Sequence, residues 1–159
     1  MATLFLVLTV IAGILVAVNG LAFPPKIPFG HLHLAAYTHL VFIGFMLQTI
    51  AGALSHLLPI SLALRRVPSN KKRTPYLATL VGIMEQWRSV QVSALSLGTM
   101  GLLLVAALLW QYSLNSTPVL ATAWTSAGLL AIGLLIFAMK VVRLLLCWPS
   151  LESAHHRSE

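Results

Sequence analysis

The chain has 159 residues, of which 58% are hydrophobic and only 8% are charged. Soluble globular domains carry roughly 25% charged residues, so this composition excludes a soluble fold and indicates the lipid bilayer as the solvent. The net charge of +7 would suggest nucleic acid as a partner of a soluble protein. Here the cations follow the pattern of membrane topology, and we expect no nucleic-acid partner.

Four apolar stretches predict an all-α, integral membrane four-helix bundle that forms one domain over residues 1–159. Each stretch approaches the roughly 20 residues with which a helix crosses a bilayer. The first could be mistaken for a signal peptide, but it lacks a basic n-region. The second should stop near Pro59, because proline interrupts helical hydrogen bonding. The predicted helices cover about residues 2–20, 31–58, 90–110 and 118–147.

Residues 76–87 are predicted to lie in the membrane interface and not across the membrane. The segment follows Pro75 and ends with Glu85, Gln86 and Arg88 close together. These polar residues would fall at mid-membrane if a span began at the proline. Glu85 and Arg88 are three residues apart, a spacing that lets them pair on a helix.

Lysine and arginine are distributed unevenly along the chain. Nine of the ten lie around the second connection or near the end of the fourth helix, and only Lys26 lies elsewhere. The positive-inside rule therefore predicts that the N and C termini are cytoplasmic. Lys140 and Arg143 are expected to snorkel from the inner end of the fourth helix to water.

The histidines of the second helix are the main candidates for chemistry. His39 lies roughly two turns inside that helix, where an imidazole must find a partner. Ionisable residues inside a membrane are functional candidates, and the alternative is a structural hydrogen bond to Ser, Thr or a backbone carbonyl. Steps of three and four residues predict one stripe that faces the bundle, formed by His39, Phe42, Met46, Thr49, Ala53 and His56.

His39 and His56 are candidate metal ligands, and the expected cofactor is haem b, because histidine is a common axial ligand of haem iron. At 1.5 Å per residue they lie about 25 Å apart, so they would serve two separate centres. The other three helices contain no histidine. Candidates for a second axial ligand are a residue of another subunit, Met100, Met139, His31 and His33. Copper is the alternative, with His31 and His33 converging on His39 at the outer face.

Residues 36–45 read AYTHLVFIGF and residues 50–59 read IAGALSHLLP. This pattern resembles the second transmembrane helix of the catalytic subunits of the haem-copper oxidase and nitric oxide reductase superfamily, in particular its small divergent members. The match covers about 24 of the 159 residues. The resemblance implies that His39 is an axial ligand of a low-spin haem near the outer face. The later helices of that family, with its second haem ligand and its copper ligands, have no counterpart in this chain.

The sequence thus favours a haem-binding electron-transfer subunit, similar to a membrane b-type cytochrome, of a larger respiratory or redox complex. Its partners would be the lipid bilayer and either other membrane subunits or further copies of the chain. We do not expect it to be catalytic on its own, and the expected location is the bacterial inner membrane. Two alternatives stay open: a cofactor-free accessory subunit that stabilises a membrane complex, and an outer-face copper-binding protein.

Overall fold

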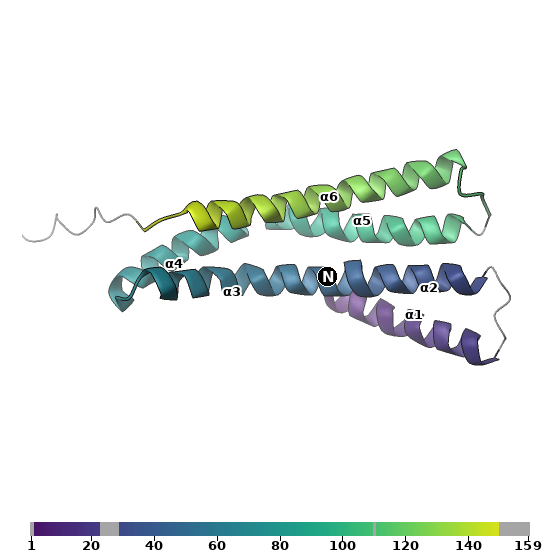
Figure 1. The fold of residues 1–159 in the computed structure, drawn as a ribbon, viewed down its shortest axis with the longest axis horizontal. Coiled ribbons are helices and arrows are strands. Elements are labelled where there is room, and N and C mark those ends of the chain that lie inside the picture. Colours follow the sequence, from purple (N-terminus) through teal and green to yellow (C-terminus); the bar gives the residue numbers. More distant parts are fainter. Residues whose placement is uncertain (1, 23–28, 110, 150–159) are drawn as a thin grey trace, which may run out of the picture.

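The computed structural model describes residues 2–22, 29–109 and 111–149, with side chains described at 2–18, 34–109 and 111–149. These ranges are helical apart from short connections and contain no strand. Helices α2, η1 and α3 follow one another without a break and form one long rod (Figure 1). The elements are α1 (Ala2–Ala22), α2 (Phe29–His39), the π-helix η1 (Leu40–Leu47), α3 (Gln48–Arg66), α4 (Asn70–Glu85), α5 (Arg88–Leu108) and α6 (Thr117–Leu146).

Three helical segments within the described ranges are long and apolar enough to cross a membrane, and one of them includes the break between α4 and α5. They are Leu34–Arg66, Asn70–Leu108 and Thr117–Leu146. The N-terminal helix contributes a shorter apolar segment, Ala2–Val18. The prediction of long apolar helices as the building blocks is therefore confirmed. Helices α5 and α6 begin and end within two residues of the predicted third and fourth helices.

The second predicted helix does not stop at Pro59. The rod continues to Arg66, and Pro59 is buried inside α3. Proline removes one backbone donor, but apolar helices tolerate this loss where packing and side-chain hydroxyls compensate. Beyond the proline, Ala63 is buried in a core cluster, and this packing stabilises the extra turns.

The basic segment after the rod is helical and not a loop. Helix α4 begins at Asn70, so it starts before the predicted interfacial segment and includes Pro75. The connection between α3 and α4 is reduced to residues 67–69. Arg73 stabilises this short turn, because its Nε donates to the Val67 carbonyl at 3.0 Å and its Nη2 to the Pro68 carbonyl at 2.8 Å.

A sharp break separates α4 from α5, as the polar residues there predicted. Helix α4 ends at Glu85, and Trp87 adopts a left-handed backbone conformation with φ 60° before α5 begins at Arg88. This conformation is unfavourable for a bulky L-residue, and the Trp87 side chain is 60% exposed. The expected ion pair is present, with 2.9 Å between Arg88 Nη1 and Glu85 Oε1.

Close helix contacts occur where side chains are small. Helices α5 and α6 run side by side along their length (Figure 1). A Cβ added at Gly98 would lie 2.7 Å from Leu130 Cγ and 3.0 Å from the Ser126 carbonyl oxygen. At the contact between η1, α1 and α5, a Cβ added at Gly44 would lie 2.9 Å from Phe5 Cδ1.

Helix α4 is fixed against the C-terminal end of α6. Arg66, at the end of α3, donates to the carbonyl oxygens of Cys147 at 2.7 Å and Leu145 at 2.8 Å. Tyr76 of α4 donates to the same Cys147 carbonyl at 2.7 Å. Beneath these bonds, an apolar cluster of α3, α4 and α6 residues packs around Leu80 and Leu144, both fully buried. The α4 end of the molecule is therefore held by apolar packing and by hydrogen bonds to backbone carbonyls.

Candidate functional site

His39 is half-buried at the last position of α2, directly before the π-helix. Its Nδ1 lies 2.6 Å from the carbonyl oxygen of Ala35, one turn earlier in the same helix. A carbonyl can only accept, so Nδ1 carries the proton and donates it. The neutral ring then presents Nε2 as its unprotonated nitrogen, the atom able to bind a metal.

The predicted bundle-facing stripe is wrong. Phe42 is 60% exposed, and His56 is exposed as well. Residues of the rod that face the other helices include Leu40, Gly44 and Ala51, which are buried. The predicted stripe misses the packed face from its start, because the buried position is Leu40 and not the adjacent His39. Successive steps of four and seven residues from Leu40 lead to Gly44 and Ala51, so the packed face runs beside the predicted stripe.

Both methionines predicted as second axial ligands have exposed side chains. Met100 of α5 is 45% exposed, and Met139 of α6 is similarly exposed. Residues His31 and His33 belong to α2, but their side chains lie outside the described residues, and so does the predicted copper cluster. Within the described residues, no group of three or more His, Cys, Asp or Glu could hold a metal ion.

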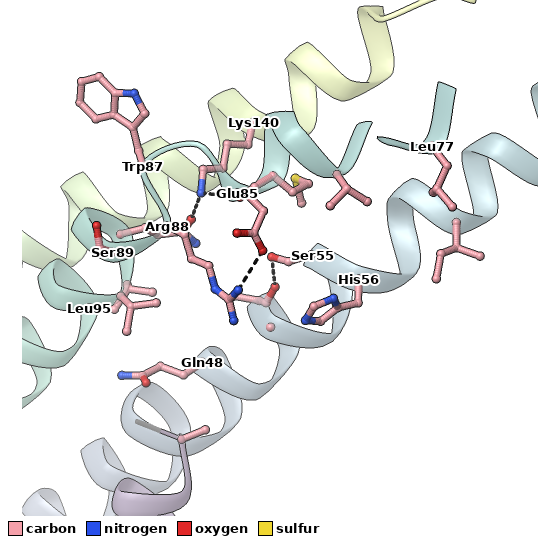
Figure 2. Close-up of a pocket in the computed structure, with 18 residues that line it drawn as sticks. Gln48, Ser55, His56, Leu77, Glu85, Trp87, Arg88, Ser89, Leu95 and Lys140 are labelled. Atoms are coloured by element: carbon pink, nitrogen blue, oxygen red, sulfur yellow. Dashed lines mark hydrogen bonds and ion pairs between the residues drawn. The ribbon is translucent and has the colours of Figure 1, made fainter. Parts of the chain in front are cut away.

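His56 lines a pocket of about 810 Å³, which we call the His56 pocket. It lies between α3, the break that joins α4 to α5, and the end of α6 that carries Lys140. Figure 2 shows His56 and Ser55 of α3 on one side of the space, with Glu85, Arg88 and Lys140 across it. The pocket thus gathers the polar residues of the α4–α5 break opposite the second candidate histidine.

Lys140 is the functional candidate that sequence reasoning missed. It does not snorkel to water, because its exposed fraction is only 6%. Its Nζ donates to Gln91 Oε1 at 2.7 Å and to the Met84 carbonyl at 3.0 Å. The last carbonyls of a helix lack intrahelical donors, and the early end of α4 makes the Met84 carbonyl one of them. A lysine within an apolar helix, together with polar residues at a predicted helix break, was the available signal.

The described structure separates His39 from the His56 pocket, and the two groups differ in chemistry. His39 offers one imidazole nitrogen in an apolar helix, whereas the pocket offers several charged groups. Comparison of the chain with protein-family models, curated proteins and solved structures finds no match. The resemblance of residues 36–59 to the haem-copper oxidase superfamily therefore stays a prediction.

Proposed function

We propose that this chain is a membrane subunit that binds one b-type haem through His39 and passes electrons within a larger redox complex of a bacterial inner membrane. The hydrogen bond from His39 Nδ1 to the Ala35 carbonyl is the observation that carries the proposal. Metal-ligating histidines almost always donate their second ring nitrogen in this way, which orients the ring and raises its basicity. The π-helix that begins at Leu40 adds support, because such segments are frequent at functional sites.

The residues present fit a haem with one axial ligand from this chain. His39 would hold the iron through Nε2, and the bound group would supply a one-electron iron couple. Helices α1, α5 and α6 contain no histidine. The side chain of Met100 is half exposed, so it does not fill the bundle interior. A sixth ligand would therefore come from another subunit or a second copy, which favours function within an assembly.

His56 is left out of this haem proposal. Its side chain is exposed and lines a pocket with charged residues from three helices. His39 does not line that pocket. We therefore propose one haem and not two, and His56 serves as the internal control.

Visible absorption spectroscopy of the purified protein, titrated with haemin in detergent, tests the proposal. We expect a saturable Soret band in the unchanged protein and in His56→Ala, and its loss in His39→Ala, because only His39 is proposed to ligate iron. The circular dichroism spectrum of each variant shows whether the helices are intact. A Soret band of equal strength in His39→Ala, or no band in the unchanged protein, would contradict haem binding at this residue.

A cofactor-free accessory subunit is the second candidate, and the outer surface of α6 favours it. Ala127, Gly128 and Ala131 are exposed there, and a Cβ added at Gly128 would meet no atom within 4 Å. Small residues let a helix of another subunit approach closely in lipid. In this case the bond from His39 to the Ala35 carbonyl only satisfies a buried polar ring. The same haemin titration would then give no Soret band that depends on His39.

A further inference from the structure

The His56 pocket contains a buried cation that forms no ion pair, because the one carboxylate of the pocket, Glu85, pairs with Arg88. Lys140 is 6% exposed, and its two recorded acceptors, Gln91 Oε1 and the Met84 carbonyl, are both neutral. The sole ion pair among the described residues is between Arg88 and Glu85. Buried lysines are normally paired with a negative group, because a desolvated charge is costly. The pocket is therefore short of negative charge.

The charged side chains that line the pocket confirm this imbalance. Lys140 and Arg88 contribute two positive charges and Glu85 one negative charge, which leaves a net charge of +1 with His56 neutral. An ammonium group has three donors, so the two recorded bonds of Lys140 leave one further N–H. Figure 2 shows Lys140, Glu85 and Arg88 together across the pocket from Ser55 of α3. An anion that contacts both cations would therefore compete with the Glu85 carboxylate for Arg88.

Most of the remaining lining of the pocket is apolar, and its uncharged polar residues are Gln48, Ser55, Ser89 and Gln91. Ile60 of α3, Leu77 and Val81 of α4, and Leu95 of α5 form its walls. A small hydrophilic anion would leave these walls without a partner, whereas an amphiphile would cover them with its hydrocarbon part. The pocket also lies in the half of the molecule that contains α4, where the basic residues of α3 and α4 gather (Figure 1). Basic pockets between membrane helices at such a face bind phospholipid head groups.

We propose that the His56 pocket binds one anionic phospholipid. The phosphate ester lies between Lys140 and Arg88, and the acyl chains run along Ile60, Leu77 and Val81 toward the bilayer. Glu85 opposes this binding because it already pairs with Arg88 and repels the phosphate. The site is independent of haem binding, since it uses no group near His39.

Native mass spectrometry of the whole protein in detergent, titrated with phosphatidylglycerol and with phosphatidylcholine, tests this site. We expect one tightly bound phosphatidylglycerol and weaker binding of zwitterionic phosphatidylcholine. The substitution Arg88→Gln should weaken phosphatidylglycerol binding by about fivefold, and Glu85→Gln should strengthen it by a similar factor. Both side chains are more than half exposed, so neither change should disturb the fold.

The substitution Arg65→Gln is the matched control, because it removes an exposed cation of α3 that does not line the pocket. It should leave phosphatidylglycerol affinity unchanged. Equal binding of the two lipids, equal losses in Arg65→Gln and Arg88→Gln, or no gain in Glu85→Gln would each overturn the proposal. A titration with soluble glycerol phosphate distinguishes a bound lipid from a bound free phosphate ester. If glycerol phosphate bound as tightly as phosphatidylglycerol, the acyl chains would contribute nothing and the lipid would be excluded.

Discussion

Many polar side chains in the apolar helices of this protein donate to backbone carbonyls, whereas the buried Thr9 Oγ1 has no partner among the described residues. His39 donates to the Ala35 carbonyl and Thr99 to the Leu95 carbonyl, each within its own helix. Lys140 differs, because its acceptors lie on other helical segments, at Met84 and Gln91. In hydrocarbon an unsatisfied polar group costs several kcal/mol, so such bonds stabilise the helices that contain these residues. Lys140 therefore connects α6 to both sides of the α4–α5 break.

Removal of the Lys140 ammonium should destabilise the protein. In Lys140→Ala, the Met84 carbonyl and Gln91 Oε1 lose their recorded donor while they are still buried. We expect the Tm in detergent, followed by circular dichroism, to fall by roughly 5 °C. Arg143→Ala is the control, since Arg143 is exposed and only donates to Gln86 Oε1 at 3.3 Å. Similar changes of Tm in both variants would show that Lys140 does not connect the helices.

At the scale of the elements, two departures from the α-helix determine which residues face one another. The π-helix η1 shifts the phase of the rod between His39 and Gln48, and the left-handed Trp87 turns α4 away from α5. Polar residues near Glu85 made the break at Trp87 predictable. The π-helix was not predictable, because residues 40–47 are almost uniformly apolar and give no change in periodicity. The predicted stripe of six residues was wrong because it started at His39 and not at the adjacent Leu40, which is buried.

The α5–α6 contact should depend on one glycine. In Gly98→Ala, the new methyl group meets Leu130 and the backbone of Ser126, and overpacking of this kind costs about 1–3 kcal/mol. Gly128→Ala is the matched control on α6, because nothing lies within 4 Å of its Cβ position. Alanine favours a helix over glycine by up to about 1 kcal/mol, so this variant should be neutral or more stable. Thermal unfolding in detergent compares the two, and a Gly98→Ala protein as stable as Gly128→Ala would contradict this packing.

The whole molecule has one strongly basic half. All eight lysine and arginine residues in the described ranges lie from Arg65 to Arg88 or on the last turns of α6. Figure 1 shows these segments together, far from the α5–α6 connection. The positive-inside rule assigns this basic half to the cytoplasm. The haem proposed at His39 would then lie nearer the outer face, and the lipid site nearer the inner leaflet.

Cysteine labelling in intact cells tests this orientation. With Cys147 replaced by serine, Ser113→Cys places a thiol between α5 and α6, and Ser69→Cys places one between α3 and α4; both positions are exposed. A membrane-impermeant maleimide should label Ser113→Cys in intact cells and Ser69→Cys only after permeabilisation. The parent without cysteine gives the background. Labelling in the opposite order would reverse the topology.

The sequence by itself determined the all-helical class and the bounds of α5 and α6 to within two residues, because hydropathy is a property of consecutive residues. It also predicted the α4–α5 break and the Glu85–Arg88 pair, which depend on neighbours within one turn. Only the tertiary structure decided that Pro59 lies inside a helix and that Lys140 is buried. These outcomes depend on partners distant in the chain, such as Met84, which is 56 residues from Lys140. Packing between segments overrides local preferences, and no pattern along a single helix contains that information.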